Sequence, residues 1–177
     1  DEVGDYAELA TLNSNLALIE GNLGHMQQAL AHARSARALG DPLGDALGPA
    51  SGAVEMYVAS HEAALGRYRE ALGSFARADA CFGGDAGTVW AGLAANYKAN
   101  LLIHLGQFAR AQQVLQHDAQ MIPVSAARRE CLRARIDHAL GHRGEHSIAN
   151  AIAMLGERPD PIQHLLLRLD AVRTLPP

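Results

Sequence analysis

A short pattern occurs three times in this chain of 177 residues, and it constrains the fold more than any other feature. Each copy reads Leu-Gly-x-(large apolar)-x-x-Ala, and the copies occupy residues 23–29, 65–71 and 105–111. Each copy lies between two segments whose apolar residues recur with helical spacing. One match to so short a pattern is common by chance, but three in order at similar spacing are not. The pattern therefore indicates an internal repeat.

The residue types in the pattern predict a hairpin of two helices. The glycine is expected to end the first helix in a left-handed conformation, which costs glycine little. The large residue then opens the second helix, and the alanine three positions later lets the two helices approach closely. The repeat-defining residues are Gly24, Met26 and Ala29 in the first copy, Gly66, Tyr68 and Ala71 in the second, and Gly106, Phe108 and Ala111 in the third.

The pattern resembles the tetratricopeptide repeat (TPR) family. The second copy matches best, with family consensus residues at Gly66, Tyr68, Ala71, Phe75 and Ala78. A small residue also stands near the first-helix consensus position in each copy; these residues are Ala17, Ala59 and Ala99.

A fourth, degenerate copy is expected around Gly141. There Arg143 replaces the large apolar residue and His146 replaces the alanine, so its packing must differ. The resemblance then covers roughly residues 5–156, which is most of the chain.

The repeats are longer than the usual TPR unit. Successive turn glycines are 42, 40 and 35 residues apart, whereas the usual unit has about 34 residues. Units of this length are similar to the TPR variants of MalT-like bacterial transcriptional activators and signalling ATPases. The resemblance implies an all-α fold, a right-handed superhelical solenoid of about four antiparallel hairpins with an additional C-terminal helix.

The apolar spacing, glycines and prolines predict where the helices lie. The expected helices are 5–21, 25–39, 51–65, 68–82, 87–105, 108–120, 126–140, 144–156 and 161–173. They group into repeats at about 5–39, 51–82, 87–120 and 126–156, followed by the terminal helix, in one domain spanning residues 1–177. Ser125 is expected to be the N-cap of the helix that follows it. Both ends of the sequence suggest a piece excised from a larger protein.

Composition restricts the partners and the compartment. Hydrophobic residues make up 49% of the chain but aromatic residues only 5%, which suits closely packed helices. The net charge of −4 argues against a general nucleic-acid surface, which needs a basic excess. No stretch approaches 18 uninterrupted apolar residues, so no membrane span is expected. Cys81 and Cys131 are expected to be buried free thiols in a reducing cytoplasm, with a disulfide as the alternative.

The resemblance also indicates where a partner would bind. In the TPR family, peptides usually lie along the concave side, which the first helix of each hairpin lines. The family frame places Asn96, Asn100 and His104 there, and their i, i+4, i+8 spacing gives one polar ladder that can hold a peptide backbone. Arg128 and Arg135 lie seven apart on the equivalent helix and would favour an acidic peptide, a C-terminal carboxylate or a phosphate. The alternative is that all five simply face solvent.

The sequence offers little support for catalysis or for a cofactor. His138, His142 and His146 have metal-like spacing, but a predicted turn separates them and no evident Cys or carboxylate completes the set. The glycines do not form a phosphate-binding loop, and no serine stands in a nucleophile elbow. The acidic residues are scattered on helix faces expected to point outward. We therefore expect neither an enzyme nor a cofactor or metal site.

The function that these patterns favour is binding of a protein or peptide. The chain would be the regulatory or sensor part of a larger bacterial transcriptional or signalling regulator. Two alternatives remain open. The terminal helix, with Ile162, Leu165, Leu166 and Leu169, could form a homodimer, or the groove could bind a small inducer.

Overall fold

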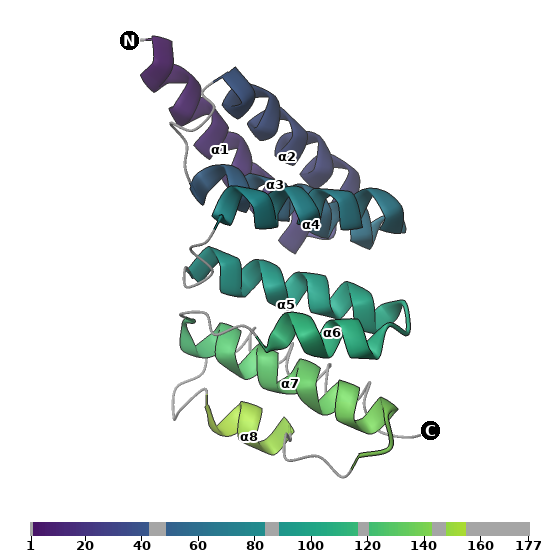
Figure 1. The fold of residues 1–177 in the computed structure, drawn as a ribbon. Helices are drawn as coiled ribbons and strands as arrows, with labels where there is room; N and C mark the ends of the chain where they lie inside the picture. Colours follow the sequence, from purple (N-terminus) through teal and green to yellow (C-terminus); the bar gives the residue numbers. More distant parts are fainter. Residues whose placement is uncertain (1, 43–48, 84–88, 117–120, 143–147, 155–177) are drawn as a thin grey trace. The chain divides into compact units, whose positions relative to one another are not determined.

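The structure, a computed structural model, describes residues 2–42, 49–83, 89–116, 121–142 and 148–154. Within these ranges it contains eight helices and no strand (Figure 1). The helices are α1 (Glu2–Asn22), α2 (Met26–Gly40), α3 (Pro49–Ala64), α4 (Tyr68–Phe82), α5 (Val89–His104), α6 (Phe108–Leu115), α7 (Pro123–Ala139) and α8 (Ile148–Ala153). The prediction of an all-α fold is confirmed.

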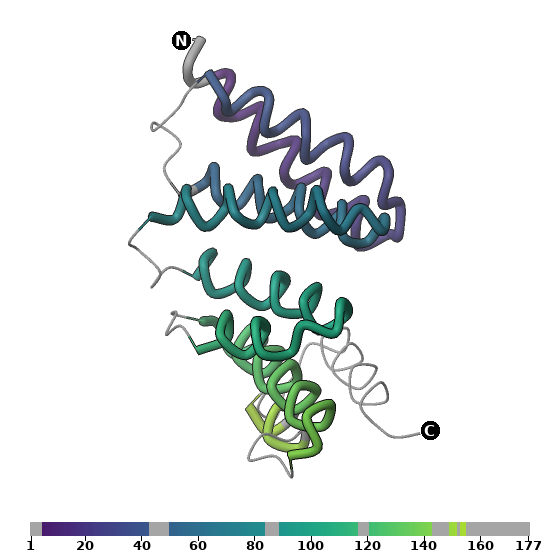
Figure 2. Tube along the Cα trace, turned by 45° about the vertical axis from the view of Figure 1, so that its right-hand side comes forward, coloured from purple at the N-terminus to yellow at the C-terminus, as the bar shows by residue number. Residues whose placement is uncertain are grey.

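The chain divides into two compact units, residues 1–85 and residues 86–177. In the first unit α1 packs against α2, α2 against α3, and α3 against α4. In the second unit α5 packs against α6, α7 packs against α8, and both α5 and α6 contact α7. Figures 1 and 2 show α1 and α2 side by side as one hairpin, with α3 and α4 as the next. Consecutive helix pairing, as the repeat predicts, is therefore present in each unit.

The hairpin turns at the three repeat glycines and at the degenerate fourth copy share one geometry. Gly24, Gly66, Gly106 and Gly141 all have a positive φ, between 70° and 83°. In each turn the glycine N–H donates to the carbonyl three residues earlier, and the next N–H donates to the carbonyl five residues earlier. This pair of hydrogen bonds satisfies carbonyls at the helix end and requires the left-handed conformation. The predicted role of these glycines is confirmed.

The small and large positions of the repeat take the predicted places. The second helix of each hairpin begins at the large apolar residue, Met26, Tyr68 or Phe108. Three residues later the alanine side chain is fully buried. The buried alanines of the pattern are Ala29, Ala71 and Ala111, together with Ala17, Ala59 and Ala99 on the first helices. Because a side chain of one carbon adds little bulk, it permits close helix packing.

Some predicted helix ends are displaced. α7 begins at Pro123, three residues before the prediction, and the residue that precedes it is Ile122. Proline suits the first helical position because its ring fixes φ and no N–H partner is needed there. Ser125 consequently lies inside α7 and is buried, so its prediction as an N-cap is wrong. The predicted terminal helix at 161–173 lies outside the described residues.

The two cysteines lie in different units and are both free. Cys131 is buried as predicted, whereas Cys81 is exposed near the end of α4. Across the described ranges, every helix is too short or too polar to cross a membrane.

Candidate functional site

The polar ladder predicted on α5 lies at its contact with α7. Asn96 is only 1% exposed, and its amide Nδ2 donates to the Ser125 carbonyl at 2.8 Å. Its Oδ1 accepts from Nε of Arg129 at 3.1 Å. Both ends of this amide therefore bond to α7, and the arrangement joins the first helices of two consecutive hairpins.

Three of the other predicted residues, Asn100, Arg128 and Arg135, extend the same contact. Asn100 accepts a hydrogen bond of 2.8 Å from Arg135, one turn further along α5. The guanidinium of Arg128 lies 4.9 Å from the ring centroid of Tyr97, within the range of a cation–π interaction. His104 is exposed in the last turn of α5.

Most of the predicted groove residues interact with other residues of the second unit. Asn96 lies inside the protein, so its assignment to a partner's backbone is replaced by a role in joining α5 to α7. Asn100, Arg128 and Arg135 are half-buried, and each interacts with another residue of the second unit. The structure thus brings four of the five predicted residues to one helix–helix contact rather than to an open surface.

Sequence reasoning missed Arg129, which lies beside the predicted Arg128. Arg129 is 3% exposed, and besides Asn96 it reaches the Gly92 carbonyl with Nη2 at 3.4 Å. Periodicity held a usable signal, because Arg129 lies in line with Leu132 and Ile136, apolar residues that follow it at steps of three and four. A polar residue at such a position predicts a hydrogen bond to the neighbouring helix.

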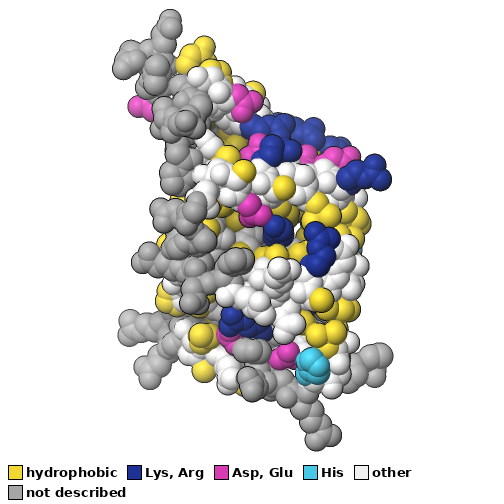
Figure 3. All heavy atoms as spheres, viewed as in Figure 1, with side chains coloured by type: hydrophobic (Ala, Val, Ile, Leu, Met, Phe, Trp, Pro, Cys, Tyr) yellow, Lys and Arg dark blue, Asp and Glu magenta, His cyan; other side chains and the backbone are white. Residues whose placement is uncertain are grey.

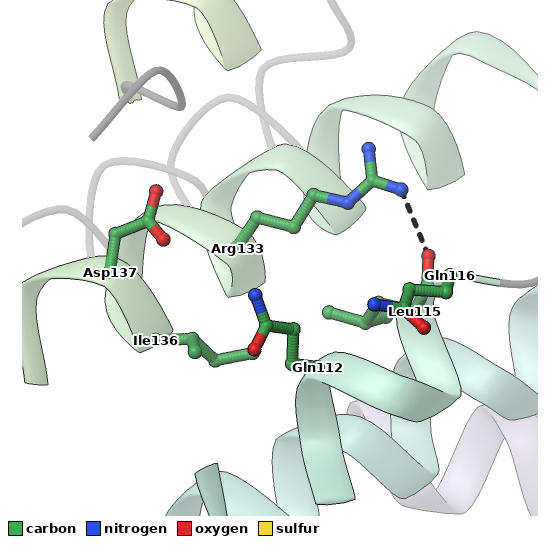
Figure 4. A pocket seen from close by; sticks show the side chains of 6 residues that line it. All are labelled: Gln112, Leu115, Gln116, Arg133, Ile136 and Asp137. Carbon is green, nitrogen blue, oxygen red and sulfur yellow. Dashed lines mark hydrogen bonds between the residues drawn. The ribbon is translucent and has the colours of Figure 1, made fainter. Parts of the chain in front are cut away.

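A cleft of about 330 Å³ opens between α6 and α7 in the second unit (Figure 4). Its lining is Gln112, Leu115, Gln116, Arg133, Ile136 and Asp137. Gln112 lies on α6 and Gln116 directly follows its last residue, and both are exposed. Arg133 and Asp137 come from α7 and are half-buried. Leu115 and Ile136 are buried and form the apolar floor.

The polar groups of this cleft combine both charges with neutral amides. Arg133 donates to the Leu115 carbonyl at 2.9 Å (Figure 4). It also donates to Glu130 at 2.7 Å, so its side chain is held against the wall. Asp137 supplies a carboxylate one turn further along α7 (Figure 4). Each glutamine amide carries both donors and an acceptor. Such a lining can bind the N–H and C=O groups of an extended backbone without requiring a charged ligand.

The first unit contains a second polar feature, which we call the charge cluster. It consists of Arg34 and Arg37 on α2, Glu55 and Glu62 on α3, and Ser74 and Arg77 on α4. Figure 3 shows Lys or Arg side chains next to Asp or Glu side chains on this face, over α2 and α4.

The acidic members of the charge cluster are the buried ones. Glu62 is 3% exposed and accepts from Arg34 at 3.0 Å and from Ser74 at 2.8 Å. Glu55 has Arg77 at 3.1 Å and Arg37 at 3.7 Å, although Arg77 is not aligned for a hydrogen bond with Oε2. The cluster therefore links three helices through two buried carboxylates.

The expectation that the acidic residues lie on outward faces is therefore wrong for Glu55 and Glu62. They are seven residues apart on one face of α3, and arginines from the two neighbouring helices compensate their charge.

Cys81 lies near the charge cluster, and partial burial raises the pKa of its thiol. The charge of Glu55 raises this pKa further, whereas the charge of Arg77 lowers it. A raised pKa lowers the fraction of thiolate, which is the reactive form of the side chain.

The predicted histidine series is only partly described. His138 is exposed in the last turn of α7, and His142 is exposed in the turn that follows the helix. His146 lies outside the described residues. In the part of the chain that the structure covers, no three His, Cys, Asp or Glu side chains come together as metal ligands would.

Comparison with known proteins gives no relative. No protein-family model matches the sequence, and no curated protein and no solved structure shows a match to it.

Proposed function

We propose that the chain is a TPR-like helical-repeat module that binds a peptide segment of a partner protein. It would serve as the regulatory or sensor part of a larger, cytoplasmic bacterial transcriptional or signalling regulator. In this proposal the hairpins continue into a right-handed superhelical solenoid. Occupancy of the peptide site would then alter how neighbouring domains associate.

The observation that carries the proposal is the cleft between α6 and α7. Two exposed amides on one wall face a fixed guanidinium and a carboxylate on the other, above an apolar floor. This arrangement suits a peptide backbone in an extended conformation, with one apolar side chain on the floor. This cleft is not the acidic-peptide site that the sequence predicts around Arg128 and Arg135. Those two arginines interact within the chain, because Arg128 stacks on Tyr97 and Arg135 bonds to Asn100.

Peptide selection tests this proposal. Short random peptides would be selected on the full chain, and their affinity measured by fluorescence anisotropy. We expect the double substitution Gln112→Ala and Gln116→Ala to weaken binding about tenfold, because each amide contributes roughly one hydrogen bond. Both side chains are exposed, so the helicity measured by circular dichroism should not change.

The matched control uses the equivalent helix of the first hairpin. Gln27→Ala with Gln28→Ala removes two exposed glutamine amides from α2 and should leave the affinity unchanged. Selection of no peptide, or equal weakening by both double variants, would overturn the assignment of the cleft as the peptide site.

A further inference from the structure

An apolar stripe runs along the exposed side of α1. Its members alternate at steps of three and four residues; they are Leu9, Leu12, Leu16, Ile19 and Leu23. Leu16 is half-buried, and the other four are between 45% and 63% exposed. The helix instead buries the small side chains of Ala10 and Ala17. Large apolar residues thus face solvent over about 21 Å, with the spacing that lets one helix pack against another.

The internal repeat shows what covers the equivalent face of α3. A shift of 42 residues superimposes the turn glycines Gly24 and Gly66. It matches Leu12, Leu16 and Ile19 with Val54, Val58 and His61, all of which are buried. Val58 packs with Leu30 and Ala33 of α2 and with Ala17 of α1. His61 lies against Gly21 of α1. The face that is exposed on α1 is therefore covered on α3 by the preceding hairpin, α1 and α2.

The second helix of the covering hairpin, α2, also supplies positive charge. Arg34 of α2 lies 3.0 Å from the buried carboxylate of Glu62 on α3. In the repeat register Glu62 corresponds to Glu20, which borders the stripe on α1. The exposed Glu8 borders its other side by helical geometry. The sequence of α1 contains no Lys, Arg or His, and His25 in the following turn lies 2.7 Å from Glu20.

From these observations we propose that the α1 stripe docks one amphipathic helix of a partner, with Arg or Lys on the flanks of its apolar face. The charges distinguish this partner from a second copy of the chain. Pairing α1 with itself would place Glu8 and Glu20 of both copies along one seam without a basic residue from either helix. Charges on such flanks determine which partner is chosen. This site is separate from the cleft between α6 and α7.

Two designed helical peptides provide the test. They share the same leucine stripe and differ only in the flanking residues, which are Arg in one and Glu in the other. Binding to the full chain would be measured by fluorescence anisotropy. We expect the Arg-flanked peptide to bind at least about tenfold more tightly. Glu8→Lys combined with Glu20→Lys should abolish or reverse that preference.

A matched leucine on the same helix controls for non-specific effects. Leu12→Gln with Ile19→Gln should weaken binding about tenfold or more, because both side chains lie on the stripe. Leu18→Gln should leave it unchanged, because Leu18 is 40% exposed but lies on another side of α1. Circular dichroism would confirm equal helicity in all variants.

Several outcomes would overturn the proposal. One is equal affinity for the two peptides, and another is that neither peptide binds. A third is a native dimer in analytical ultracentrifugation that Leu12→Gln with Ile19→Gln dissociates, which would assign the stripe to a second copy. Because no cleft residue is changed, each outcome is independent of the peptide-binding test.

Discussion

Gly52 and Gly73 are both helical glycines, yet their surroundings give opposite predictions. A Cβ on Gly52 would lie 2.5 Å from the Phe82 ring, whereas one on Gly73 would meet only Nη1 of Arg77 at 3.8 Å. We expect Gly52→Ala to lower the free energy of unfolding by about 1–3 kcal/mol through overpacking. Gly73→Ala should raise it by about 0.5–1 kcal/mol, because alanine favours the helix.

Urea denaturation followed by circular dichroism measures both effects. Equal shifts for the two variants would mean that helix propensity decides the result and that Phe82 moves aside without cost.

His61 is the residue for which burial predicts a pH effect. Its Nε2 is buried without a hydrogen-bond partner, and burial lowers the pKa of the imidazole below its usual 6.5. Above pH 6.5 the ring is neutral in both folded and unfolded chains. Below that value the unfolded chain binds the proton more readily, so the free energy of unfolding falls as pH falls. The slope contributed by His61 can reach about 1.4 kcal/mol per pH unit.

Comparison with a His61→Leu variant isolates this contribution. The stability advantage of the native chain over the variant should shrink as the pH falls below 6.5. A difference that stays constant over the acidic range would show that the ring is solvated in the folded protein.

At the scale of elements, one amide makes two of the buried hydrogen bonds between α5 and α7. Asn96→Ala removes a hydrogen bond to the Ser125 carbonyl and another from the Arg129 guanidinium, both buried. We expect a loss of about 2–3 kcal/mol in the free energy of unfolding, because bonds to charged groups are the stronger ones. Asn100→Ala, which removes one half-buried bond to Arg135, should cost about 1 kcal/mol.

Thermal and urea unfolding of the two variants checks the order. If Asn96→Ala proved as stable as the native chain, the amide would not hold these helices together. A role for Asn96 in binding a partner would then regain support.

The charge cluster shows a different way of joining elements. Glu62 lies between α2 and α4, and its two oxygens accept from Arg34 and Ser74. A buried carboxylate with partners on two helices specifies how those helices meet, although its net contribution to stability is small. The corresponding Glu20 on α1 lies beside an exposed stripe, so the same residue type serves packing in one hairpin and presents charge in the other.

At the scale of the whole molecule, the repeat predicts the hairpins but not the division into units. Three patterned turns and a degenerate fourth all form, and the helices after the first three begin at Met26, Tyr68 and Phe108 as expected. The repeat pattern predicts one domain of hairpins, and the contacts of the chain gather into two compact units, residues 1–85 and 86–177. A repeat pattern specifies the helices and the turn within each hairpin. It does not specify how extensively one hairpin packs against the next.

The sequence by itself determined the helices, the turns and the buried alanines, because these follow from local chemistry. A glycine with positive φ ends a helix wherever it occurs, and a small side chain suits a close helix contact. Only the tertiary structure decided where polar side chains go. Periodicity placed Asn96 and Asn100 on one face of a helix, but α7 turned that face into an interior contact. The α1 stripe likewise stays exposed, whereas the hairpin of α1 and α2 covers the equivalent face of α3, because burial depends on which helices pack against that face.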